Sequence, residues 1–178
     1  MERTSFAHMR CSLARGLDLI GDWWSPLILR DLFLGVVRFD ELVEDLGISR
    51  NLLTQRLRAL ATNGIVDRVA YQRHPMRYEY RLTEAGRDLV PVLLALMAWG
   101  DRWAAPRQGR PIVFRHARCD HECTAFVTCS ACGKPLTVNE LVALPGPGGA
   151  ATRGTKVVAR KLVAAARKPI IDRQATSE

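Results

Sequence analysis

The chain has 178 residues, a length that suits one globular domain with a smaller appendage. Hydrophobic residues make up 48% and charged residues 25%, and no apolar run approaches the ~20 residues that cross a bilayer, so a membrane-spanning protein is excluded. The formal net charge of +8 favours a polyanionic partner.

Four short helices are predicted in the first third of the chain. Pro26 suits the first turn of a helix, because its missing N–H has no partner there, and Gly35 ends that helix. Gly47 ends the next helix, and the Ser49 hydroxyl can cap the start of the one after it. The expected helices cover residues 12–20, 25–34, 39–46 and 50–63.

A β-hairpin and a long helix follow. Residues 65–72 and 76–82 alternate well enough for two strands, and Arg73, His74 and Pro75 form the turn between them. Thr83 then caps the helix EAGRDLVPVLLALMAWGDRW, in which Pro91 either introduces a bend or marks the true start. This helix is apolar nearly all round, so the expected cover for it is a second copy of the chain.

A short helix, a glycine turn, a polar-faced helix and a basic hairpin follow one another in the order of a winged helix. That fold places one helix in the DNA major groove and the hairpin beside it. Leu53, Leu57 and Leu60 would face the core, which leaves a polar face for bases and phosphates, unless that face is merely solvated. The helix residues expected to contact DNA are Ser49, Arg50, Asn51, Thr54, Gln55 and Arg58. The expected hairpin residues are Arg68, Arg73, His74 and Arg77.

Residues 11–103 contain, in order, the stretches CSLARGLDLIGDWW, LILRDLFLGVVRFDELVEDLGISRNLLTQRLRAL, NGIVDRVAY, YEYRLTEAG and LVPVLLALMAWGDRW. In these stretches the chain resembles the HxlR-type winged-helix regulators of bacteria, which are relatives of the MarR regulators. The resemblance implies a homodimeric, sequence-specific transcription factor that dimerises through the N-terminal helix and the long helix after the hairpin. We expect a repressor that binds a near-palindromic operator in double-stranded DNA.

The expected fold is mainly α with a small β-hairpin. Residues 1–105 are predicted to form the winged helix-turn-helix domain, including its long dimerisation helix. Residues 106–144 are predicted to form a linker and a small Cys-rich extension, and residues 145–178 a basic, flexible tail. Within that tail, a short basic helix around Lys156–Arg167 is the alternative.

Four cysteines within 14 residues, in the pattern C-x3-C-x5-C-x2-C, predict a zinc site. Cys129 and Cys132 make one half-site, while Cys119 can pair with either Cys123 or His121 in the other. The zinc is expected to be structural, because the segment has little core of its own. Metal sensing and a thiol redox switch are the alternatives. The candidate ligands are Cys119, His121, Cys123, Cys129 and Cys132, with His116 nearby.

Cys11 lies just before the first helix, whose N-terminal dipole can lower the pKa of a thiol. In several regulators of the resembled family a cysteine at this position senses oxidants or electrophiles, although here Ser12 stands where a proline is common. Cys11 is therefore a candidate redox sensor, and a structural cysteine at the dimer interface is the alternative. A small-molecule effector, held in a pocket lined by tryptophans, is a further candidate partner.

Other function classes find less support. The chain has no GxSxG, HExxH, Walker or dinucleotide-binding motif, so we do not expect an enzyme. The alternatives are a non-specific nucleic-acid-binding zinc protein and a regulator that senses metal through its cysteines. The N-terminal residues MERTSFAHMRCS lack the apolar stretch of a signal peptide, and together with the clustered cysteines this predicts a cytoplasmic location.

Overall fold

The computed structural model describes residues 5–166, which divide between two compact units. The winged-helix unit is residues 20–126, and the terminal unit combines residues up to 19 with those from 127 onward. These units do not coincide with the segments 1–105, 106–144 and 145–178, and those domain boundaries stay a prediction.

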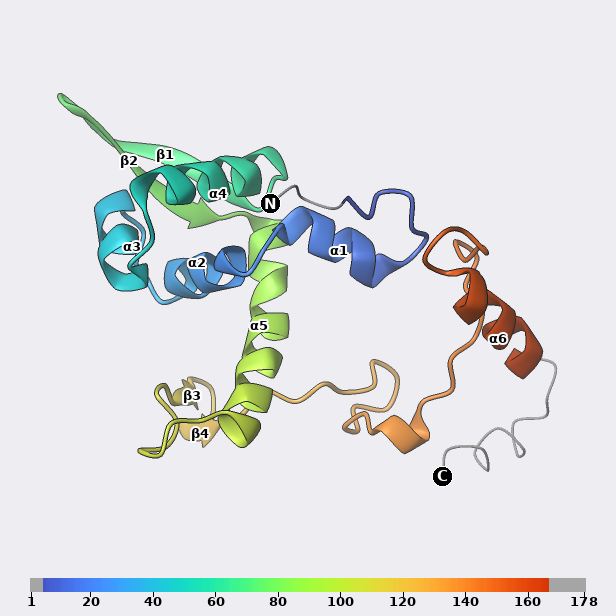
Figure 1. Ribbon diagram of the computed structural model, residues 1–178. Helices are drawn as coiled ribbons and strands as arrows, with labels where there is room; N and C mark the ends of the chain where they lie inside the picture. Colours follow the sequence, from blue (N-terminus) through green and yellow to red (C-terminus); the bar gives the residue numbers. More distant parts are fainter. Residues whose placement is uncertain (1–4, 167–178) are drawn as a thin grey trace. The chain divides into compact units, whose positions relative to one another are not determined.

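The secondary structure is mainly helical, with two small antiparallel sheets in the described residues (Figure 1). The winged-helix unit contains α2 (Trp24–Phe33), α3 (Phe39–Leu46), α4 (Arg50–Thr62), β1 (Val66–Arg73), β2 (Met76–Leu82), α5 (Glu84–Trp103), β3 (Phe114–His116) and β4 (His121–Cys123). The terminal unit contains α1 (Ser12–Ile20, except its last residue), the 3-10 turn η1 (Val138–Glu140) and α6 (Lys156–Ala166).

A single apolar core holds the winged-helix unit together. It forms where the inner faces of α2, α3 and α4 meet the start of β1, and Leu89 and Leu93 of α5 pack against it. Burial of such side chains contributes roughly 1.5–3 kcal/mol each to folding. The buried apolar members are Ile28, Leu29, Leu32, Leu42, Ile48, Leu53, Leu57, Leu60, Ile65 and Val66.

Local signals set most of the element boundaries. The Asp22 carboxylate accepts hydrogen bonds from the backbone N–H groups of Trp24 and Ser25, so α2 begins one residue earlier than Ser25-Pro26 alone indicates. Thr83 caps α5 through a bond from Gly86 N at 3.1 Å. A Cβ at Gly86 would collide with the carbonyl oxygen of Ile65, so only glycine lets α5 start against β1.

Three details differ from, or resolve, the sequence predictions. Arg73 pairs with Met76 in the ladder, so the hairpin loop is His74-Pro75 and not a three-residue turn. The helix α5 begins at Glu84, which excludes Pro91 as its start. In the region predicted to be a flexible tail, α6 covers Lys156–Ala166, which nearly matches the alternative basic helix around Lys156–Arg167. Residues 167–178 of that tail lie outside the described residues.

The segment before α3 pairs with the free edge of β2 in the first hairpin. Tyr80 N donates to Val37 O at 2.8 Å, and Arg38 pairs with Glu79. The chain thereby ties the start of α3 to β2, while the tip of the hairpin projects beyond the helices (Figure 1). This tie holds the hairpin beside α4, which is the arrangement that a winged helix needs.

The second hairpin, β3–β4, is also part of the winged-helix unit. The Phe114 ring lies 6.0 Å from the Phe33 ring of α2, centroid to centroid. A hollow of about 110 Å³ separates this hairpin from α5, and Leu94, Met97 and Cys123 are among its lining residues. No described helix is long and apolar enough to cross a membrane.

Candidate nucleic-acid interface

The start of α4 is shaped by two residues of the turn before it. Gly47 adopts a left-handed conformation with φ of 61°, and Ser49 Oγ accepts a hydrogen bond from Leu52 N at 3.3 Å. Ser49 is therefore occupied as a helix cap, although its exposed position leaves it near any phosphate at this helix end. Leu53 and Leu57 are buried, which turns the other face of α4 outward.

The predicted DNA-contacting residues of α4 all lie on that outward face and are exposed. Arg50 is engaged, because its guanidinium pairs with Asp40 at 2.6 Å and lies over the Phe39 ring. The Thr54 hydroxyl donates to the carbonyl oxygen of Arg50 at 2.8 Å. Among the described residues, no side chain pairs with Arg58. This arginine is therefore free to take a ligand.

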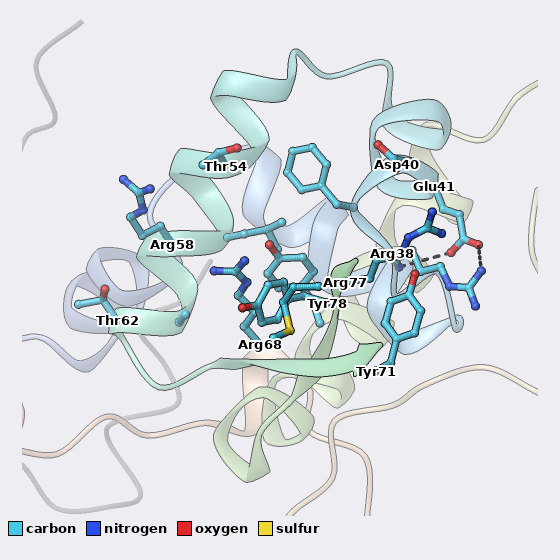
Figure 2. A pocket seen from close by; sticks show the side chains of 15 residues that line it. Arg38, Asp40, Glu41, Thr54, Arg58, Thr62, Arg68, Tyr71, Arg77 and Tyr78 are labelled. Atoms are coloured by element: carbon cyan, nitrogen blue, oxygen red, sulfur yellow. Dashed lines mark hydrogen bonds and ion pairs between the residues drawn. The ribbon is translucent and has the colours of Figure 1, made fainter. Parts of the chain in front are cut away.

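A groove of about 870 Å³ separates α4 from the first hairpin (Figure 2). Arg58 lines it from the helix, and Arg68, Arg77 and Tyr78 line it from the strands. The other lining residues are Arg38, Phe39, Asp40, Glu41, Thr54, Leu57, Ala61, Thr62, Tyr71, Met76 and Tyr80. Four arginines thus face two carboxylates, which makes the groove cationic.

Two of these arginines rest on aromatic rings. The Arg68 guanidinium lies 3.5 Å from the centre of the Tyr78 ring, and that of Arg38 lies 5.1 Å from the Tyr71 ring centre. Such stacking holds the planar group in place while its N–H edges stay available for phosphate. Glu41 pairs with Arg38 at 3.9 Å, so that arginine is partly neutralised.

The predicted hairpin residues separate into two sets. Arg68 and Arg77 line the groove, whereas Arg73 and His74 stand exposed at the hairpin tip and do not line it. Gln72 stiffens this tip by donating to the carbonyl oxygen of His74 at 2.8 Å. The tip and the groove therefore offer two separate basic contacts to a ligand.

Sequence reasoning missed several groove residues, chiefly Arg38 and the tyrosines Tyr71, Tyr78 and Tyr80. Strand alternation could have placed Tyr78 and Tyr80 on one face of β2. Arg38 carried no such signal, because only the pairing of its segment with β2 brings it to the groove.

Two charged pairs lie behind this surface. Arg56, on the inner side of α4, forms an ion pair with Asp22. Asp31 is buried in α2, and burial raises the pKa of its carboxyl, although the bonded guanidinium of Arg30 acts in the opposite direction. Neither pair faces the groove, so both contribute to the fold.

The predicted half-site Cys129–Cys132 is a tight turn. Gly133 N donates to Cys129 O at 2.8 Å, and Gly133 has a positive φ of 71°. Backbone N–H groups of Cys132 and Ala131 donate to the Cys129 thiol and lower its pKa, which favours the thiolate that binds metals.

The other predicted ligands occur in and after the turn of the second hairpin. Cys119 lies in the turn with its sulfur 3.3 Å from Nδ1 of His116, and His121 Nδ1 lies at the carbonyl oxygen of Cys119. Cys123 lies opposite Phe114 in the ladder. Within the described residues, no three His, Cys, Asp or Glu side chains gather closely enough to hold a metal ion.

Cys11 is half-buried in the terminal unit. It lines a mainly apolar hollow of about 520 Å³, together with Arg10 and residues of α6 such as Val158, Arg160 and Leu162. The hollow places this thiol beside a cavity large enough for a small organic molecule.

Comparison with known proteins matches residues 19–108 to the HxlR-like helix-turn-helix family. The chain belongs to this family. An HTH-type transcriptional regulator of Mycobacterium tuberculosis is 45% identical over 137 residues, which are 77% of this chain and 87% of that protein. One from Synechocystis is 44% identical over 94 residues, 52% of this chain and 70% of that protein.

Solved structures give the same result for this HxlR-like chain. The candidate transcription factor PA1607 is 33% identical, with a TM-score of 0.71, over 80% of this chain and 100% of that one. The redox regulator HypR in its oxidized form is 35% identical, with a TM-score of 0.50, over 54% of this chain and 100% of that one. The winged helix-turn-helix fold is confirmed, and the chain is a transcriptional regulator of a DNA-binding helix-turn-helix family.

Proposed function

We propose that this HxlR-like regulator is a homodimeric repressor that binds a near-palindromic DNA operator. In the proposal, the outward face of α4 reads bases in the major groove, and the arginines between α4 and the hairpin hold the phosphate backbone. Asn51, Gln55 and Arg58 are the proposed base readers, with Ser49, Arg50 and Thr54 beside them. Arg68, Arg73, His74 and Arg77 are the proposed hairpin contacts.

The observation that carries this proposal is the cationic groove between α4 and the hairpin. Arg58 is unpaired among the described residues, and Arg68 is held against Tyr78 with its N–H edges free. A recognition helix and a basic hairpin that share one surface match the shape and charge of duplex DNA.

The test is selection of bound duplexes from a random DNA pool by the purified, reduced chain at near-physiological salt. We expect enrichment of a near-palindrome with half-sites about 34 Å apart, or a multiple of that distance. Recovery of unenriched DNA by zinc-loaded protein would favour non-specific nucleic-acid binding instead. A reporter gene placed behind the selected site distinguishes repression from activation.

A stripe of exposed apolar side chains on α5 supports the dimer. Val92, Leu96, Trp99 and Trp103 recur every three or four residues and are each at least 57% exposed. A contiguous stripe of this kind usually marks an interface. The occupant proposed here is α5 of a second copy, because a two-fold dimer presents two recognition helices to a near-palindromic site.

Replacing Leu96 by Glu tests the dimer. A charge buried in the centre of the interface should weaken dimerisation by about 2 kcal/mol or more, roughly 30-fold in the dissociation constant. Molar mass by light scattering over a dilution series measures this change. The matched control is Val138→Glu, which places the same charge at an exposed position outside α5. An unchanged mass for Leu96→Glu would contradict the proposed interface.

We also propose that the cysteine-rich segment binds a structural zinc ion. The Cys129–Cys132 turn fits zinc, because it presents two thiols on a glycine-ended turn and lowers the pKa of the Cys129 thiol. Zinc there would order a stretch of chain that has little core of its own. Metal-dependent DNA binding, rather than metal-dependent folding alone, would point to a metal-responsive regulator.

A response to oxidants, electrophiles or a small molecule is proposed for Cys11. Its support is the half-buried thiol beside the apolar hollow of the terminal unit. Treatment of the wild type with an oxidant or electrophile should alter operator affinity, and Cys11→Ser should abolish that response.

A further inference from the structure

Two turns in the chain share one backbone geometry, although only one of them is recognisable from cysteine spacing. The cysteine turn, residues 129–133, runs C-x2-C-G, and the histidine turn, residues 116–120, runs H-x2-C-D. In the cysteine turn, Gly133 N donates to Cys129 O at 2.8 Å. In the histidine turn, Asp120 N donates to His116 O at 2.8 Å. The same bond thus closes each turn at the residue that follows its last cysteine, Cys132 or Cys119.

The two turns also agree at the residue after the last cysteine, which is Gly133 in one turn and Asp120 in the other. Gly133 has a φ of 71° and Asp120 a φ of 59°, so both adopt the left-handed conformation. Asp120 is the only non-glycine residue with positive φ in the described part of the chain. Left-handed backbone is uncommon for such a residue, although Asp tolerates it better than most. The histidine turn is therefore held in a shape that its sequence does not favour.

The side chains of the histidine turn meet as two ligands of one metal ion would. His116 Nδ1 lies 3.3 Å from Cys119 Sγ. Tetrahedral zinc with Zn–S of about 2.3 Å and Zn–N of about 2.0–2.1 Å separates these two atoms by about 3.5 Å. Both residues are exposed, so neither is held there by burial in a core.

The two competitors for the second half-site lack this arrangement. Cys123 lies in β4, opposite Phe114, and lines the hollow beside Leu94 and Met97. His121 directs Nδ1 to the carbonyl oxygen of Cys119 and not to a sulfur. Neither residue belongs to a turn like that of Cys129 and Cys132.

We propose that His116 and Cys119 are a zinc-ligand pair, in place of Cys119 with Cys123 or with His121. This assignment rests on the proposal that the cysteine-rich segment binds zinc. The assignment supplies one imidazole nitrogen and one thiolate from the same turn, and both are common ligands of structural zinc.

The test compares zinc content among full-length variants purified with Zn²⁺ and dialysed without chelator. Wild type should hold about one zinc ion per chain. His116→Ala and Cys119→Ser should lower zinc affinity by more than about ten-fold, the scale on which even the loss of an outer-shell partner acts. His121→Ala and Cys123→Ser are the matched controls and should keep wild-type zinc.

A second measurement covers variants that fold poorly. His116→Cys should retain zinc, and its Co²⁺ form should gain thiolate-to-metal absorbance, because one more sulfur binds the ion. Retention of zinc by His116→Ala together with loss in His121→Ala or Cys123→Ser would overturn the assignment and leave the zinc proposal standing. A wild type without zinc would overturn both, while operator selection would still test the regulator function by itself.

Discussion

The winged-helix core and the cysteine-rich segment are ordered by different means. Ten buried apolar side chains form the core between Ile28 and Val66. By contrast, the structure describes all of residues 106–144, the cysteine-rich segment, and none of them is buried. In the second region, short turns closed by backbone hydrogen bonds replace packing, and such turns are marginal without a bound ion. One chain thus contains a part that packing stabilises and a part that, in our proposal, zinc stabilises.

The largest expected effect comes from a cavity in the core. Leu53→Ala removes a fully buried side chain and should reduce the free energy of unfolding by about 2–5 kcal/mol. Urea denaturation followed by circular dichroism measures this loss. The matched substitution Leu141→Ala, at a residue 58% exposed in the cysteine-rich segment, should cost less than about 0.5 kcal/mol. Equal losses would remove the contrast between the two regions.

Cys129→Ser tests the same contrast from the metal side. Loss of this thiolate should release zinc and raise amide hydrogen exchange across residues 111–144, because no buried side chain anchors this stretch. Exchange in α2 and α4 should stay as in wild type. Phe114 packs on Phe33, so exchange should rise least at the start of this stretch. Unfolding of α4 in this variant would show that the two regions fold as one.

Arg58 and Arg56 sharpen the comparison inside the core region, since they lie on opposite faces of α4. Arg58→Ala should weaken operator binding by about 1–3 kcal/mol and relax the preference for one base. Arg56→Ala breaks the pair with Asp22 and should lower stability while leaving base preference unchanged. Fluorescence anisotropy with wild-type and mutated operators measures both effects. A larger loss of base preference for Arg56→Ala would place the reading face elsewhere.

The smallest expected effect concerns Asp31, a charged residue in the core region. Burial raises its folded-state pKa, so its protonated form adds stability that is present below the unfolded pKa of about 3.9. That stability is lost as the pH rises through the folded pKa. Asp31→Asn should therefore show a smaller fall in unfolding free energy above about pH 4 than wild type. Parallel curves from urea titrations would count against a raised pKa.

The extent of sequence prediction also differs between the two regions. The helices, the caps Ser49 and Thr83 and both hairpin strands were predictable, because each depends on nearby residues and on a simple period. The start of α2 was predicted to within one residue, but the capping role of Asp22 was not predicted. The role of Arg38 in the groove was missed for another reason, namely that it depends on pairing with β2.

The sequence by itself determined the succession of helices and strands, the outward polar face of α4 and the family, because these follow from local periodicity and motif. Only the tertiary structure decided which arginines share the groove. It also placed His116, rather than His121 or Cys123, beside the Cys119 sulfur. Those arrangements depend on strand pairing and on left-handed turns, which bring together side chains whose spacing in the chain carries no signal.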